Sequence, residues 1–184
     1  VFNGEIYNIS EIKKIISSYG LKLKTKSDTE LILKMYKIFG TECVKYFEGM
    51  WAFAILDYTK KIVFISRDRL GEKPLYFLKD KGNFFFGSET KFVRILLNNY
   101  KVINKKKIYQ YLKNGYKSIE ASNETFFKGI FKVKSGTNLI IKKNLTIKEI
   151  TYWEPKINEK KFSEKKSAQL IKENFKKKIK DICD

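Results

Sequence analysis

Apolar residues recur every three or four positions in two segments of the first forty residues. Ile12, Ile15, Ile16 and Tyr19 form the first such face, and Gly20 follows it. This spacing places the side chains on one side of a helix, and glycine commonly ends a helix. The pattern therefore predicts a helix that stops at Tyr19.

The second helical segment carries its own start signal. Residues 27–30, SDTE, have the S/T-x-x-E form of a capping box, and apolar residues at helical spacing then continue to Phe39, before Gly40. Between the two helices, residues 21–25 alternate apolar and polar and predict a short strand. A further helical turn is expected through Cys43 and Val44.

The middle of the chain has the apolar runs typical of strands. Two hairpins are expected, one from 51–57 and 61–66, and one from 74–78 and 84–87 with its turn at 80–82. Further strands are expected over 126–133, 137–141 and 146–153, and helices over 88–97 and 105–113. Because these runs are nearly all apolar, the sheet should be covered on both faces. The order of elements predicts an α+β layered fold.

The end of the chain has a different pattern. Ser163 can cap a helix that carries apolar residues on one face and lysines on the other; the apolar positions are Ala168, Ile171, Phe175, Ile179 and Ile182. Nothing within this segment offers that face a partner. Residues 153–184 are therefore expected to be a linker and the first helix of a following domain.

The formal net charge of +19 suggests nucleic-acid binding, but the composition argues against a specific interface. Only three of the 39 basic residues are arginines, the residues with the planar fork that nucleic-acid surfaces favour. Residues 58–155 hold 21 basic and 8 acidic residues, whereas residues 1–57 are nearly neutral. We expect weak, non-specific attraction to nucleic acid only.

Cysteine and histidine usage limits the chemistry further. The chain has no histidine, and its cysteines, Cys43 and Cys183, lack metal-ligand spacing. This excludes a Cys/His or Ser/His pair within the chain and predicts no metal site. Two unpaired cysteines are typical of a reducing cytosol, so a cytoplasmic location is expected. No apolar run approaches the length of a membrane helix.

The first residues combine groups that suit a small polar ligand. Val1 and Phe2 have the character of the end of a buried strand, and Asn3, Gly4 and Glu5 are expected to turn out of it. Asparagine supplies an amide donor, glycine permits close backbone approach, and glutamate supplies a carboxylate. Asn-Gly is also a common turn pair, which is the purely structural alternative. The position of this segment predicts that residues belonging upstream are missing.

Five blocks in a fixed order carry a resemblance to a known family. They are 2–8 (FNGEIYN), 27–30 (SDTE), 49–55 (GMWAFAI), 67–76 (RDRLGEKPLY) and 86–89 (FGSE), with Lys91 after the last. Together they resemble the glutaminase domain of glutamine-hydrolysing asparagine synthetases. This is a class II glutamine amidotransferase domain with the αββα sandwich of N-terminal-nucleophile hydrolases. The resemblance implies such a domain over residues 1–152, incomplete at its N-terminus.

The resemblance also implies roles for individual residues. Asn3 and Gly4 would form the oxyanion hole of glutamine hydrolysis, while Glu5 and Asp28 would hold the α-amino group of L-glutamine. For Asp28 a purely structural role at the helix start is the alternative. The nucleophilic cysteine of the family is absent from the chain. Neither Cys43, expected to be a buried structural residue, nor Cys183 in the tail replaces it, so the chain is expected to be an inactive fragment.

In the family, ammonia from glutamine passes to a synthetase domain in which ATP and Mg²⁺ activate aspartate for conversion to asparagine. The resemblance therefore implies L-glutamine and a synthetase domain as partners, with no cofactor in this chain, and it is compatible with a homodimer. Two alternatives stay open: a non-catalytic glutamine-binding or interaction module, and an amidotransferase for another carboxylate such as a sugar acid. Arg67, Asp68 and Arg69 are expected to form a structural salt-bridge cluster at the sheet edge and the junction of the two domains, with contact to the substrate as the alternative.

Overall fold

The computed structural model describes residues 1–98, 100–116, 122–156 and 162–183. Its first helices are α1 (Ile9–Ser18) and α2 (Asp28–Phe39), followed by a 3-10 helix, η1 (Gly40–Tyr46). These are the two helices and the helical turn that the apolar spacing predicts. Gly40 ends α2 with a φ of 59°, a conformation that glycine adopts at little cost.

Two antiparallel sheets form the centre of the molecule. The main sheet has the strand order β1-β2-β3-β7-β8, with β1 (Phe2–Ile6) at one edge. Its other strands are β2 (Gly49–Asp57), β3 (Ile62–Arg67), β7 (Thr137–Lys142) and β8 (Ile147–Thr151). The small sheet has the order β5-β4-β6, from β4 (Tyr76–Asp80), β5 (Asn83–Gly87) and β6 (Phe131–Lys132). Three more helices are α3 (Thr90–Leu96), α4 (Lys105–Asn114) and α6 (Glu164–Cys183).

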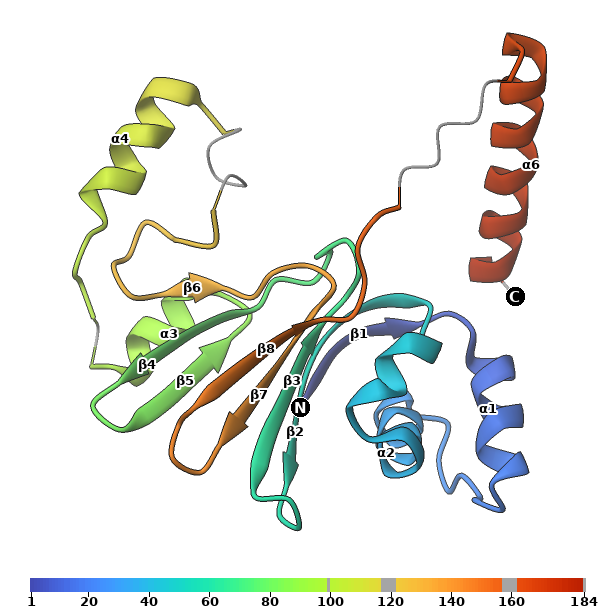
Figure 1. Cartoon of the computed structure of the whole chain (residues 1–184), viewed down its shortest axis with the longest axis horizontal. Helices are drawn as coiled ribbons and strands as arrows, with labels where there is room; N and C mark the ends of the chain where they lie inside the picture. Colours follow the sequence, from blue (N-terminus) through green and yellow to red (C-terminus); the bar gives the residue numbers. More distant parts are fainter. Residues whose placement is uncertain (99, 117–121, 157–161, 184) are drawn as a thin grey trace.

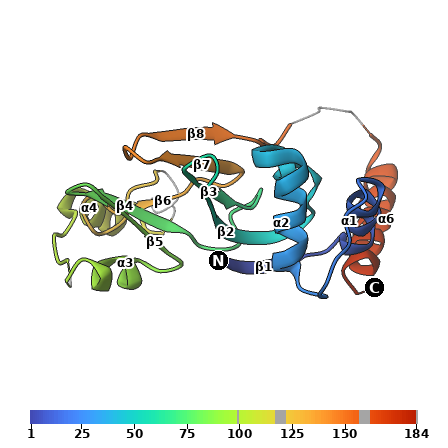
Figure 2. The same ribbon diagram turned by 90° about the horizontal axis from the view of Figure 1, so that it is seen from below.

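The apolar core divides into three layers that define the architecture. The largest packs α1, α2 and η1 on one face of the main sheet, around Trp51 and Phe64. The second lies between the two sheets, around Ile65, Leu75 and Leu139. The third packs α3 on the outer face of the small sheet. Figures 1 and 2 show the resulting order of helices, sheet, sheet and helix. The fold is an α+β αββα sandwich, and both sheets are covered as expected.

Some local predictions are wrong. Residues 3–5 do not turn out of a strand but lie within β1, because β1 pairs with β2 from Phe2↔Phe53 to Ile6↔Gly49. Residues 21–25 form no strand, since that stretch joins α1 to α2 away from both sheets. The strand expected over 126–133 is reduced to β6 and isolated bridges.

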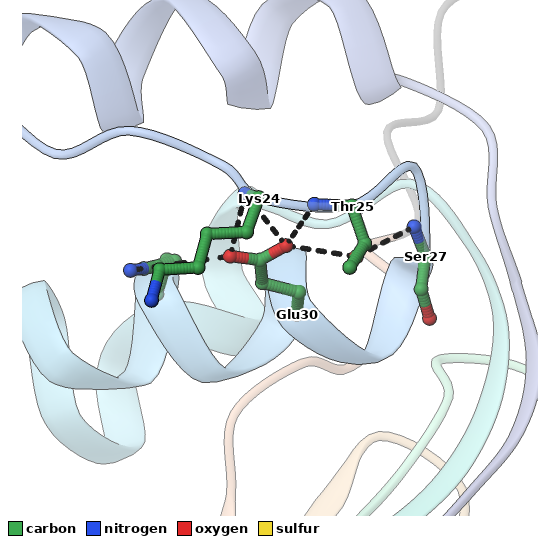
Figure 3. Close-up of polar contacts among 5 residues, drawn as sticks. Lys24, Thr25, Ser27 and Glu30 are labelled. Carbon is green, nitrogen blue, oxygen red and sulfur yellow. Dashed lines mark hydrogen bonds and ion pairs between the residues drawn. The ribbon is translucent and has the colours of Figure 1, made fainter.

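The predicted capping box at the start of α2 is only half formed. The Ser27 hydroxyl accepts a hydrogen bond from the Thr29 backbone N–H at 3.2 Å, as a cap should. Glu30, however, does not reach back to Ser27. Its carboxylate accepts hydrogen bonds from the backbone N–H of Lys24 (2.9 and 3.0 Å) and of Thr25 (2.7 Å), and from the Thr25 hydroxyl (2.8 Å), as Figure 3 shows. Glu30 therefore fixes the preceding loop against the helix.

Helix α6 stands apart from the sandwich. Its side chains Ile171, Phe175 and Ile179 are exposed, and α6 lies outside the layers of the sandwich (Figure 1). An ion pair of 2.7 Å joins Lys178 Nζ to Glu48 Oε2, with both side chains about half exposed. The side chains of Ile182 and Cys183 lie outside the described part of the chain. Among the described residues, no helix is both long and apolar enough to cross a bilayer.

Candidate glutamine site

Strand β1 presents the predicted site residues at the edge of the main sheet. Phe2 and Ile6 pack into the core on the helix side. Because side chains alternate along a strand, Asn3 and Glu5 point to the opposite face, and both are exposed. The strand therefore separates its apolar anchors from its polar groups.

The backbone of β1 alternates in the same way. The N–H groups of Val1 and Tyr7 bond to carbonyl oxygens of β2 and of the residue preceding it, Ala54 (3.0 Å) and Glu48 (2.8 Å). In an antiparallel ladder the N–H groups of successive residues point alternately towards and away from the partner strand, so residues 2, 4 and 6 direct theirs away from β2. Gly4 and Ile6 are two such residues, so their N–H groups face the open edge of the sheet.

Position 4 requires glycine for a steric reason. Gly4 has a φ of 151°, and a β-carbon there would overlap the carbonyl oxygen of Met50 and lie 2.7 Å from the Cα of Trp51. A side chain would force β1 away from β2. Gly49 has the same constraint against Glu5, with a φ of 142°. The two glycines therefore allow the backbones of β1 and β2 to approach closely. This approach sets the position of the Gly4 N–H.

Asp28 lies beside the same edge. Its Oδ2 accepts a hydrogen bond of 3.0 Å from the Ile6 N–H, the next edge-facing donor after Gly4. Two residues of a strand span about 6.6 Å, so the Asp28 carboxylate and the Gly4 N–H lie roughly that far apart along the edge. As the first residue of α2, Asp28 also places negative charge at the positive end of the helix. Its structural and proposed binding roles are therefore compatible.

A small cavity of about 160 Å³ lies against the other part of β1. It is lined by Asn3 and by residues from three other sequence blocks, namely Ala52, Phe53 and Ala54, Pro74 and Leu75, and Gly87 and Ser88. Segments far apart in sequence thus meet beside Asn3. The fifth block, 27–30, meets β1 at Ile6 through Asp28. No role was predicted for Gly87 and Ser88, which also line the cavity. Both belong to the FGSE block at 86–89, which is the sequence signal that could have identified them.

Asp68 organises the loop that follows β3. It is 1% exposed, and its carboxylate accepts hydrogen bonds from the backbone N–H groups of Leu70 (3.1 Å), Glu72 (2.9 Å) and Lys73 (2.9 Å), with a longer one from Trp51 (3.3 Å). Since a carboxylate has room for several donors, these bonds replace its hydration. The loop is thereby fixed next to Pro74 and Leu75 of the cavity wall.

The predicted salt-bridge cluster at 67–69 is wrong in its chemistry. The Arg67 guanidinium donates to the backbone carbonyls of Lys73 (2.7 Å), Val133 (2.6 Å) and Gly71 (2.5 Å), and Arg69 donates to the carbonyl of Phe47 (3.0 Å). These side chains bond to backbone groups rather than to one another, because buried main-chain groups of the loop need partners. The two arginines stabilise the loop after β3, but they do so through hydrogen bonds to backbone carbonyls and not through salt bridges.

Three carboxylates lie near Tyr7, just after β1. Burial raises the pKa of the Tyr7 hydroxyl, and the nearby carboxylates of Glu72, Glu5 and Asp68 raise it further. Tyr7 therefore stays neutral and able to donate a hydrogen bond at neutral pH. The acidic surroundings suit a cationic group such as an ammonium.

Cys43 lies away from this strand edge. It is fully buried in the helix-side core, and burial raises the pKa of its thiol to about 12. A thiol of this kind is protonated and inaccessible at neutral pH, so its structural role is confirmed. The described residues contain no group of three or more potential metal-ligating His, Cys, Asp or Glu side chains.

Comparison with known proteins shows the family. A family model described as a glutamine amidotransferase domain matches residues 1–153. The chain belongs to the glutamine amidotransferase domain family. This amidotransferase domain is 41% identical over 157 residues to a putative glutamine-hydrolysing asparagine synthetase 2 of Methanocaldococcus jannaschii, covering 84% of this chain and 29% of that protein. It is 30% identical over 153 residues to asparagine synthetase 1 of Bacillus subtilis, covering 83% of this chain and 24% of that protein.

Solved structures show the same fold. A glutamine phosphoribosylpyrophosphate amidotransferase of B. subtilis matches with a TM-score of 0.58 at 18% identity, over 83% of this chain and 28% of that one. The amidotransferase domain thus has the sandwich of N-terminal-nucleophile hydrolase amidotransferases. The chain spans less than a third of the length of these curated relatives.

Proposed function

We propose that this chain binds L-glutamine along the open edge of β1, as the glutaminase part of an asparagine synthetase. The Gly4 N–H and the Asn3 amide would receive the side-chain oxygen of glutamine, and Asp28 and Glu5 its α-ammonium. Five bonds separate the α-nitrogen of glutamine from its side-chain oxygen, roughly 6 Å when extended. This length matches the separation of about 6.6 Å between Gly4 and the Asp28 position, and that match carries the proposal.

The arrangement suits acyl transfer at an amide. When a nucleophile adds to the carboxamide carbon, negative charge develops on its oxygen, and two fixed donors stabilise that charge. Loss of one such donor typically costs about 3–4 kcal/mol of transition-state stabilisation. The donors here are held in place before reaction, since Gly4 belongs to a paired strand.

We further propose that the 184-residue chain by itself binds glutamine without hydrolysing it. Hydrolysis in this family needs a thiolate next to the oxyanion donors, whereas the Cys43 thiol is enclosed and its pKa is raised to about 12. Ammonia would be made in a longer protein and used by a synthetase domain that holds ATP and Mg²⁺. Aspartate is the proposed acceptor because relatives of 30–41% identity are named asparagine synthetases. An amidotransferase for another carboxylate, such as a sugar acid, is the alternative.

Calorimetric titration of the chain with L-glutamine tests the proposal. We expect saturable binding, and we expect Asp28→Asn to weaken it about tenfold or more, because a charge-assisted hydrogen bond contributes about 1.5–3 kcal/mol. Asp80→Asn, at the end of β4, is the matched control and should bind as the parent does. L-asparagine, shorter by one methylene, should bind more weakly. Absence of saturable binding, or equal affinity of Asp28→Asn and the parent, would overturn the proposal.

A further inference from the structure

A second hollow lies away from β1, where the chain leaves β8. This groove has a volume of about 480 Å³ and is bounded by the 67–71 loop, by β6 with the residues after it, and by Trp153, Glu154 and Pro155. Its lining does not include Asn3, Gly4, Glu5 or Asp28. It is therefore a separate site from the proposed glutamine edge.

The charges around this groove are predominantly positive. Four cationic residues line it, Arg67, Arg69, Lys132 and Lys134, whereas Glu154 is the one carboxylate among its described lining residues. Lys134 also forms an ion pair of 2.7 Å with Glu149, but both side chains are about half exposed, so solvent screens the pair. The groove lining therefore contains more cationic than anionic side chains.

The two arginines of the groove are held rigidly. Arg67 is held by hydrogen bonds to the carbonyls of Lys73, Val133 and Gly71. Arg69 is anchored by the carbonyl of Phe47, and its Nε is buried without a hydrogen-bond partner in the described structure. The Arg69 side chain as a whole is partly exposed and lines the groove.

The residue types match one class of ligand. Two of the three arginines of a lysine-rich chain line this groove. A guanidinium binds the paired oxygens of phosphate and carboxylate groups, and lysine adds a point charge. Ser135, Thr151 and Asn123 add neutral polar side chains to the same lining, whereas the Thr137 hydroxyl already donates to the Ser135 carbonyl. We propose that the groove binds the oxyanion of a small phosphate- or carboxylate-bearing molecule.

Titration calorimetry on the full chain, with pyrophosphate and with succinate at constant ionic strength, tests this inference. We expect saturable binding with one ligand per chain for at least one of the two. Binding of pyrophosphate alone identifies a phosphate-bearing ligand, and binding of succinate alone identifies a carboxylate-bearing one. If neither ligand saturates, or if several bind per chain as expected for diffuse attraction to a charge of +19, the proposal is overturned.

Substitutions then locate the site. Arg69→Gln and Lys132→Gln should each weaken binding at least tenfold. Lys143→Gln removes the same charge from the exposed turn after β7, outside the groove, and should leave the affinity unchanged. Circular dichroism identifies any variant that has not folded, and Lys132→Gln leaves the buried arginines intact. Equal weakening by Lys132→Gln and Lys143→Gln would contradict a defined site.

Discussion

Single residues decide how close the strands come. Gly4 and Gly49 allow backbone contact between β1 and β2 that no side chain permits. Asp68 replaces the water of its carboxylate by four backbone donors, and Arg67 satisfies three carbonyls of the same region. The groups near the proposed site are therefore held by main-chain contacts, which suits a site whose own donor is a main-chain N–H.

Gly4→Ala tests the close approach. A positive φ by itself costs a non-glycine residue about 1–2 kcal/mol. At Gly4 the β-carbon would also overlap the backbone of β2, so we expect the free energy of unfolding to fall by roughly 3–5 kcal/mol. Urea denaturation measures this quantity. Gly82→Ala is the control, because Gly82 has a φ of 79° but open space around it and should be destabilised by only about 1–2 kcal/mol. Equal destabilisation at both positions would contradict a steric clash between a side chain at position 4 and the backbone of β2.

At the scale of elements, loops depend on contacts that local sequence does not reveal. SDTE predicts a cap, and Ser27 does cap α2, yet Glu30 bonds to Lys24 and Thr25 instead of to Ser27. The apolar alternation over 21–25 suggests a strand, but without a neighbouring strand its N–H groups turn to Glu30. The chain therefore uses one carboxylate to order a loop that has no sheet to join.

This contact predicts a pH dependence. The hydrogen bonds from the backbone of Lys24 and the hydroxyl of Thr25 hold the pKa of Glu30 below its ordinary value of 4.5. A lowered pKa in the folded state adds stability above pH 4.5, which is lost as the pH falls through the folded value. Glu30→Gln should therefore be less stable than the parent at pH 7, and the difference should shrink towards pH 3. Urea denaturation across this range measures it, with Glu154→Gln as an exposed control. A constant difference at all pH values would contradict the assignment.

At the scale of the whole molecule, the sandwich and α6 are separate in their packing. Each layer of the sandwich shares an apolar core with the next, whereas α6 leaves Ile171, Phe175 and Ile179 exposed. The Lys178–Glu48 ion pair is a half-exposed contact of the kind that typically contributes about 0–1 kcal/mol. The stability of the sandwich should not depend on this helix.

Removing residues 157–184 tests that independence. The shortened chain should keep its free energy of unfolding within about 1 kcal/mol of the parent, because the apolar side chains of α6 are exposed and a half-exposed ion pair contributes about 0–1 kcal/mol. Thermal and urea denaturation measure this, and Lys178→Gln in the full chain reports the contribution of the ion pair alone. Destabilisation by several kcal/mol on shortening would show that α6 packs on the sandwich more closely than its exposed apolar face indicates.

The sequence by itself determined the helices, most strands and the family, because apolar periodicity and turn residues act over a few positions and five ordered blocks mark the amidotransferase domain. Only the tertiary structure decided that residues 3–5 continue a strand, that Arg67 and Asp68 bond to backbone, and that Asp28 meets the Ile6 N–H. These contacts join groups distant along the chain. Pairing, burial and strand direction, which local pattern does not encode, determine where each donor and acceptor points.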